Sequence, residues 1–203
     1  MMYEEPLFKS ADDALRYAFS YSGQAYDRPT MNRMADGPHK SGKGLAGIDG
    51  AAQAGMIRAE LKGIGGLFLA IVTASYAPTT FPCDCGSACC SGQKVNLEWA
   101  EAITTITQTA AGRVSCGSNL RLRRTIVANC FLRKSDRKPI GDVADYCGVH
   151  RDTASDHNAK IALWLSGMRS RGSNPAIIGE IDRAKEAAYQ ALYCAGFFAE
   201  MAA

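Results

Sequence analysis

Half of the cysteines in this sequence lie within eight residues. They are Cys83, Cys85, Cys89 and Cys90, in a chain that contains eight cysteines in all. Disulfides between such close neighbours are strained by their geometry, whereas thiolates are good ligands for zinc. Small and polar residues separate these cysteines, so the backbone can turn tightly enough to bring the sulfur atoms together. The spacing C-x-C-x3-C-C therefore predicts a metal site, and Zn2+ is the ion that we expect.

The ligand set and the ion both have alternatives. Cys116 or another distant cysteine can replace one of the four ligands, and a loop of free thiols needs no metal at all. An iron–sulfur cluster is less favoured, because its usual cysteine spacings do not occur in this sequence. Four sulfur ligands leave no open position for a water molecule, so we expect a structural rather than a catalytic zinc.

A second informative segment runs from Pro139 to His157 and has the pattern of a helix-turn-helix. Ala144 is small enough to lie where two helices cross. Gly148, four residues later, can adopt the positive φ that a sharp turn requires. Val149 follows the turn as a branched apolar residue that can fill the junction between the helices. The segment therefore predicts a motif that binds double-stranded DNA.

The residues expected to meet DNA fall into two sets. On the second helix we expect base-edge contacts from Arg151, Asp152 and Asp156, and contacts nearer the phosphates from His150, Thr153, Ser155 and Lys160. Between positions 113 and 138 there are eight basic residues and one acid. This basic stretch can supply further phosphate contacts, from Arg121, Arg123, Arg124, Arg133 and Lys134. The alternative is a pair of packed helices that never touches DNA, which the two aspartates on the outer face would favour.

No group of residues indicates an enzyme, and no catalytic residue is expected. Residues 37–44 match the G-x4-G-K part of a phosphate-binding loop, but Gly44 stands where a Ser or Thr would hold magnesium. We therefore expect a flexible basic loop there. The three histidines are scattered, and His157 is interpreted as a helix-face residue rather than a ligand. The acidic residues that a nuclease would need are interpreted as helix surface: Asp142, Asp145, Asp152 and Asp156.

Helical spacing and breaker residues predict the elements that position these two segments. Helices are expected at residues 11–19 (capped by Ser10), 48–61, 67–76, from 97 onward (capped by Asn96), 119–132, in two short pieces after Pro139, and at 177–201. Residues 27–47 and 171–175 are expected to be loops, no stretch alternates as a strand would, and Trp99 and Trp164 are expected in the core. The prediction is an all-α fold with a cysteine-rich zinc knuckle and a helix-turn-helix. Its parts would be an N-terminal helical region (1–80), the knuckle with basic helices (81–138), and the helix-turn-helix with the C-terminal helix (139–203).

The composition is that of an ordinary globular protein. The chain has 203 residues and a net charge of +3, and its 47% apolar and 21% charged residues argue against disorder. The first residues are acidic and include no apolar stretch, and the longest apolar run (67–72) is far shorter than the roughly 20 residues that span a bilayer. We therefore expect a soluble, cytoplasmic protein with reduced cysteines and no membrane partner.

The segment around Gly148 resembles the helix-turn-helix of the lactose-repressor family. The resemblance is carried by Asp142-Val143-Ala144-x-Tyr146-x-Gly148-Val149, followed by Thr153-x-Ser155. His157 departs from the aliphatic residue that is usual at its inner position. Packing there is expected to be looser, or to pass to Ile161 and Leu165.

The order of the parts resembles the late-gene antiterminators of lambda-type bacteriophages, the Q proteins. The chain is of similar size, and an apolar helix at 67–76 leads into the cysteines. A further stretch that contains Cys116, at residues 112–116, comes after them, and the helix-turn-helix follows. Q proteins pair two C-x2-C units, whereas here the cysteines are bunched. The resemblance implies a transcription antitermination factor that binds a late promoter in a bacterial host cell and travels with RNA polymerase past terminators. The rival is a DNA-binding repressor or activator that does not travel with the polymerase.

Overall fold

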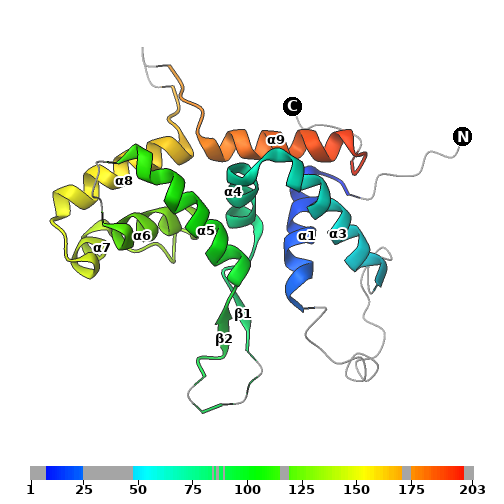
Figure 1. Cartoon of the computed structure of the whole chain (residues 1–203), viewed down its shortest axis with the longest axis horizontal. Helices are drawn as coiled ribbons and strands as arrows, with labels where there is room; N and C mark the ends of the chain where they lie inside the picture. Colours follow the sequence, from blue (N-terminus) through cyan, green and yellow to red (C-terminus); the bar gives the residue numbers. More distant parts are fainter. Residues whose placement is uncertain are drawn as a thin grey trace, which may run out of the picture. The chain divides into compact units, whose positions relative to one another are not determined.

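Helices and one small hairpin make up nearly all the regular secondary structure of the described residues (Figure 1). The computed structural model describes residues 8–24, 48–83, 85, 87, 88, 90–114, 119–170 and 175–198. Its α-helices are α1 (Ala11–Gln24), α3 (Ile48–Leu61), α4 (Gly66–Tyr76), α5 (Leu97–Thr109), α6 (Leu120–Phe131), α7 (Ile140–Cys147), α8 (Arg151–Ser166) and α9 (Glu180–Cys194), with short 3-10 helices η1 (Lys62–Ile64) and η2 (Ala110–Arg113). The predicted helical fold class is confirmed. The predicted loop at 27–47 lies outside the described residues, as do residues 171–174, Cys89 and Cys116.

Capping side chains explain where two of the helices begin. At α1, the Ser10 Oγ accepts a hydrogen bond from the Asp13 N–H (3.2 Å), as the sequence predicts. At α6, Asn119 accepts from the N–H groups of Arg121 (2.9 Å) and Leu122 (3.4 Å). The predicted bounds of α3 agree with the structure, because Leu61 is followed directly by the glycine-rich turn.

The sequence contains no stretch that alternates as a strand would, yet the structure includes one small hairpin. Strands β1 (Thr80–Pro82) and β2 (Gln93–Val95) form a two-stranded antiparallel sheet in which Phe81 lies opposite Lys94. Three-residue strands are too short to show a period of two, and every β2 residue is exposed. The hairpin matters because the cysteine-rich segment connects its two strands.

The predicted helix at 177–201 is shorter than expected. Helix α9 begins at Glu180, because Ile177 is extended and exchanges two backbone hydrogen bonds of 2.8 Å with Met168. It ends at Cys194, just before Gly196, whose φ of 77° is left-handed. Local periodicity could not show this bridge, since the bridge pairs two residues that lie in different segments of the chain.

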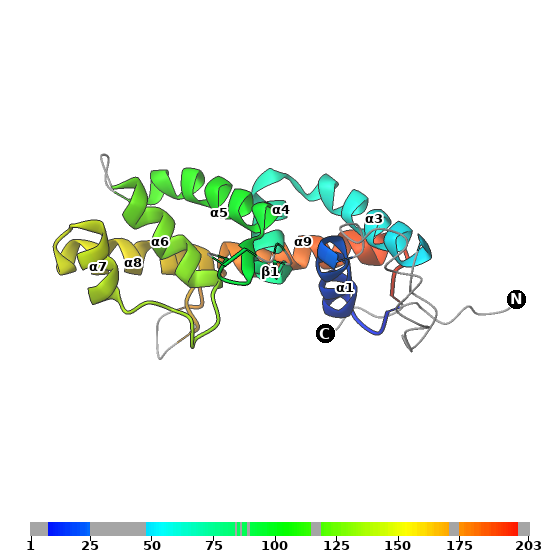
Figure 2. The same ribbon diagram turned by 90° about the horizontal axis from the view of Figure 1, so that it is seen from below.

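The chain divides into two compact units. The first contains residues 1–64, 76–96 and 188–203, and its core includes Leu15, Phe19, Ile57 and Leu61, all fully buried. In it α1 packs against α3 (Figure 2), and the Arg58 guanidinium lies over the Phe19 ring at 4.8 Å while its Nε donates to the Ala18 carbonyl (3.1 Å). The Tyr76 hydroxyl donates to Asp12 and lies 3.1 Å from the Tyr189 hydroxyl, and burial raises the pKa of Tyr76.

The second unit contains residues 65–75 and 97–187 and includes the helix-turn-helix. Helix α6 packs against α5, α7 and α8, and buried aliphatic residues fill the space between them: Ile103, Ile106, Leu122, Ile126, Ile161 and Leu165. The two tryptophans are half-buried rather than core residues. The Trp99 Nε1 donates to the Ala74 carbonyl (3.2 Å), and the Arg113 guanidinium lies 5.5 Å from the Trp164 ring centre.

None of the helices in the described part of the chain combines the length and the apolar composition needed to cross a bilayer.

Candidate nucleic-acid interface and metal centre

Three helices of the second unit form a helix-turn-helix with a supporting helix. Helices α7 and α8 contact each other across the turn at Gly148, and α6 contacts both of them. Figure 1 shows the three helices grouped at one end of the unit. Because α6 packs against both α7 and α8, it helps to fix the angle at which these two helices cross.

The turn between α7 and α8 has the geometry that the sequence predicts. Gly148 has φ 65° and ψ 38°, the left-handed conformation. The Gly148 N–H donates to the Asp145 carbonyl (3.2 Å) and the Val149 N–H to the Ala144 carbonyl (3.1 Å), which is the Schellman pattern of helix ends. Both bonds satisfy carbonyls that α7 would otherwise leave without partners, so the direction of the chain into α8 is fixed by the backbone.

One face of α8 is buried along its whole length. Ala154, Ile161 and Leu165 have no exposed surface, and His157 is 4% exposed. Burial therefore continues through Ile161 and Leu165, as expected for a motif in which a histidine replaces the usual aliphatic residue. His157 therefore lies on the buried face of α8, not on its solvent-facing side.

The opposite edge of α8 is exposed at every residue that the sequence assigns to DNA. These residues are His150, Arg151, Asp152, Thr153, Ser155, Asp156 and Lys160. Both acids on this edge have a basic neighbour: Asp156 Oδ2 lies 2.7 Å from the Lys160 Nζ, and Asp152 Oδ2 lies 3.4 Å from the His150 Nδ1. Lys160 offsets the negative charge of Asp156, which would otherwise repel the phosphates of DNA. The edge therefore presents donors and acceptors together.

The basic residues before the motif divide into outward and inward groups. Arg121, Arg124, Arg133 and Lys134 are exposed. Arg123 is half-buried and its Nε donates to the Thr107 carbonyl (2.9 Å), which gives it a packing role between α6 and α5. The four aspartates that were interpreted as helix surface, on α7 and α8, are all exposed.

Tyr146, Arg137 and Lys138 were not among the residues singled out as DNA contacts. Tyr146 on α7 is 58% exposed and faces two cations, and Arg137 in the linker donates to the Leu132 carbonyl (2.9 Å). The sequence signals were the basic stretch, to which Arg137 and Lys138 belong, and an aromatic residue within the helix-turn-helix pattern. The position of the linker, which decides what lies beside Tyr146, is a tertiary feature.

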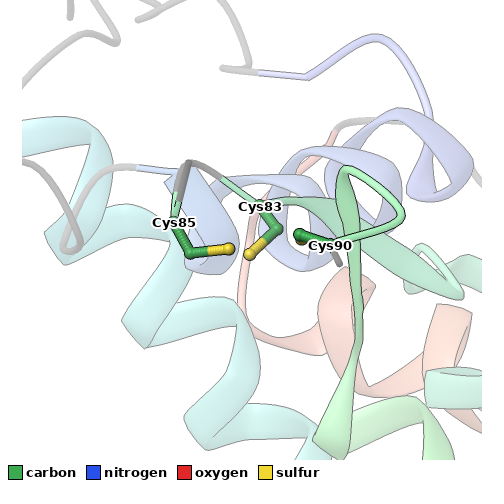
Figure 3. A group of neighbouring side chains, drawn as sticks. All are labelled: Cys83, Cys85 and Cys90. Atoms are coloured by element: carbon green, nitrogen blue, oxygen red, sulfur yellow. The ribbon is translucent and has the colours of Figure 1, made fainter. Parts of the chain in front are cut away.

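Three of the four predicted metal ligands come together in the first unit. The Sγ atoms of Cys83, Cys85 and Cys90 all lie within 4.8 Å of one another, and in Figure 3 the sulfurs of Cys83 and Cys85 point toward each other. Tetrahedral zinc with bonds of about 2.3 Å separates its sulfur ligands by about 3.8 Å, so the group needs only a small inward shift to bind a metal ion. The fourth predicted ligand, Cys89, lies outside the described residues.

The local environment favours the thiolate at Cys85. A hydrogen bond from the Ser87 N–H, with further bonds from the thiols of Cys90 and Cys83, lowers the pKa of Cys85 to about 7. At Cys83 the Cys85 N–H acts in the same direction, but the neighbouring thiols outweigh it and raise the pKa.

The hairpin carries these cysteines in the loop that connects its two strands. Cys83 directly follows β1, and its N–H donates to the Gly92 carbonyl (2.9 Å) across the ladder. The Cys90 N–H donates to the Ser87 carbonyl (2.9 Å), which closes a tight turn inside the loop. Cys85 is exposed and the other two thiols are half-buried, so little apolar packing holds the loop. A metal cross-link would supply the order that two three-residue strands cannot.

Comparison with known proteins identified no protein-family model, no curated protein and no solved structure that matches the chain.

Proposed function

We propose that the chain is a sequence-specific DNA-binding transcription regulator that places the N-terminal half of α8 in the major groove. The observation that carries this proposal is the division of α8 into two faces. Its inner face is buried against α6 and α7, whereas the seven residues of its outer edge are exposed. A rigid helix with a free polar edge behind a left-handed turn is the arrangement with which helix-turn-helix proteins read bases.

Charge around the motif supports the proposal. Four exposed basic residues on α6 and in the following turn lie in the same unit as α8: Arg121, Arg124, Arg133 and Lys134. Phosphate neutralisation by such residues supplies most of the non-specific affinity of DNA-binding proteins. The edge of α8 would add sequence preference, through Arg151 to guanine and through Asp152 or Asp156 to cytosine.

Selection from a random duplex library tests this function. The full-length protein should enrich one sequence, and fluorescence anisotropy should show about 10³-fold or tighter binding to that sequence than to shuffled DNA at physiological salt. Enrichment of no sequence, with equal affinity for all duplexes, would contradict base reading. Absence of any duplex binding would contradict the proposed function altogether.

We propose zinc as the ion held by Cys83, Cys85 and Cys90, with Cys89 as the predicted fourth ligand. Three converging thiolates suit zinc better than hard cations, and its role would be structural. Protein purified without chelator should contain close to one zinc per chain. Cys85→Ser should lower that content, whereas Cys194→Ser, which removes an exposed cysteine on α9, should not. A metal-free protein with an ordered hairpin would contradict the zinc proposal.

The finer proposal, from the Q-protein resemblance, is antitermination by contact with bacterial RNA polymerase. The order of an apolar helix, a cysteine hairpin and a helix-turn-helix along the chain supports it. In-vitro transcription with purified polymerase on a template carrying the selected site and a downstream terminator separates the two candidates. Readthrough that depends on the site is expected of an antiterminator, whereas inhibition or activation at the promoter alone would favour the plain regulator.

A further inference from the structure

Three side chains from three segments of the second unit converge beside α7. The Tyr146 ring projects from α7, the Arg121 guanidinium lies 5.5 Å from its centre, and the Lys138 ammonium lies 5.1 Å from it. Arg121 belongs to the first turn of α6, and Lys138 belongs to the linker that joins α6 to α7. All three side chains are exposed, and the ring is 58% exposed. We call these three residues the clamp, and it is accessible from solvent.

Two asparagines hold the backbone at the clamp. Asn119 accepts from the Arg121 N–H (2.9 Å), and its Nδ2 donates to the Cys147 carbonyl at the end of α7 (3.2 Å). Asn129 accepts from the Lys138 N–H (3.2 Å) and donates to the Lys138 carbonyl (2.9 Å). Each asparagine therefore joins two of the three segments, so the two cations are carried by positioned backbone rather than by a free loop.

Within the described residues, no carboxylate forms an ion pair with either cation. The ion pairs that the described part of this unit contains join Lys160 to Asp156 and Arg183 to Glu180, and Asp152 lies beside the His150 ring. The acids nearest in sequence to Tyr146 are Asp142 and Asp145 on α7, and both are exposed. The negative face of the Tyr146 ring attracts both cations, but it does not carry the full charge needed to balance two of them. The clamp can therefore accept an anion.

We propose that Arg121, Lys138 and Tyr146 bind one backbone phosphate of the DNA duplex. The inference rests on the proposed function, since the phosphate belongs to the DNA that α8 reads. Charge-assisted hydrogen bonds from the guanidinium and the ammonium would reach the phosphate oxygens, and the Tyr146 hydroxyl would donate a third. Asn119 and Asn129 are positioning residues. A contact made by α6, the linker and α7 together would fix the register of the motif on the duplex without reading sequence.

The test compares two double variants that remove the same charge. Arg121→Gln with Lys138→Gln disables the clamp, and Lys62→Gln with Arg183→Gln removes one lysine and one arginine from exposed positions on η1 and α9. Affinity is measured by anisotropy between about 50 and 200 mM salt, on the selected site and on a random duplex. The clamp variant should bind both duplexes about tenfold or more weakly than the control variant. Its slope of log affinity against log salt should be smaller in magnitude by about 1, because one phosphate contact is lost.

Tyr146→Phe tests the hydroxyl while it keeps the ring. This variant should bind both duplexes roughly two- to tenfold more weakly, with an unchanged melting temperature. Lys138→Gln alone, in the linker, takes the place of the double variant if circular dichroism shows that the latter is not folded. It should lower the salt slope by about 1.

The outcomes separate this inference from the proposed function. If the wild-type protein binds its site and the clamp variant matches the control variant in affinity and salt slope, the clamp is contradicted and the proposed function stands. If the clamp variant loses affinity for the selected site alone, its residues read bases and the assignment to phosphate is wrong. If the wild-type protein binds no duplex, both fall.

Discussion

At the scale of single residues, burial separates the cysteines of this chain by reactivity. Burial raises the pKa of Cys130 on α6 to about 11, although the nearby Arg137 acts to lower it. Cys194 at the end of α9 is exposed. A thiol reacts through its thiolate, so the two should differ widely in reactivity near neutral pH.

We predict that iodoacetamide at pH 8 modifies Cys194 much faster than Cys130. A pKa of about 11 leaves about one thousandth of Cys130 as thiolate at that pH. Because the folded state holds this proton more tightly than the unfolded chain, the same shift stabilises the fold below pH 9, and that stability is lost as the pH rises from about 9 to about 11. Peptide mass spectrometry after timed alkylation measures the two rates. Equal rates in the folded protein would contradict the raised pKa of Cys130.

Single residues also mark where sequence reasoning reached its limit. Ser10 as a cap and Gly148 as the turn residue were predictable, because their effects depend on the nearest few residues. The inward direction of Arg123 was not, because it is set by the Thr107 carbonyl sixteen residues earlier.

At the scale of elements, the turn between α7 and α8 decides whether the outer edge of α8 is presented. Gly148 lies in the left-handed region, yet a Cβ built on it meets nothing within 4 Å. A side chain there would therefore strain the backbone without a clash. Gly141 in the first turn of α7 also has open space but keeps helical geometry.

Gly148→Ala should therefore lower the free energy of unfolding of the second unit by about 1–2 kcal/mol. Gly141→Ala, the matched control, should leave it unchanged or raise it, because alanine favours helix more than glycine does. The two tryptophans of the chain, Trp99 and Trp164, both lie in this unit, so urea unfolding followed by tryptophan fluorescence reports its stability. Equal effects of the two substitutions would contradict the left-handed turn.

Helices were easier to predict than the hairpin for a physical reason. Local end signals mark these helices, since a glycine-rich stretch follows α3 and the Asn119 cap precedes α6. Strands β1 and β2 exist only as a pair, and the start of α9 depends on the pairing of Ile177 with Met168. Non-local hydrogen bonds of this kind leave no periodic trace in the sequence.

At the scale of the whole molecule, the cysteine cluster and the helix-turn-helix belong to different compact units with separate buried cores. The cysteine hairpin has little apolar packing of its own, whereas α6, α7 and α8 share a continuous buried core. The two candidate sites should therefore respond differently when metal is removed.

Chelation of the full-length, zinc-loaded protein should reduce amide-exchange protection in the hairpin and leave α6, α7 and α8 protected. The amides of Cys83 and Asn96, which donate to Gly92 and Thr79 across the ladder, are the most informative probes. Binding and folding are coupled at structural zinc sites, so loss of the ion should open the segment that it holds. Exchange mass spectrometry with and without chelator measures the change. Unchanged hairpin protection would contradict a structural metal there.

The most direct test of the account is the affinity of Arg151→Ala for the selected DNA site and for random duplex. Arg151 is the first residue of α8 and is exposed on its outer edge, so it should contact a base. We predict a loss of about 1–3 kcal/mol on the selected site and little change on random DNA, with Arg183→Ala on α9 as the control. Equal losses on both duplexes, or no loss on either, would contradict base reading by this edge of α8.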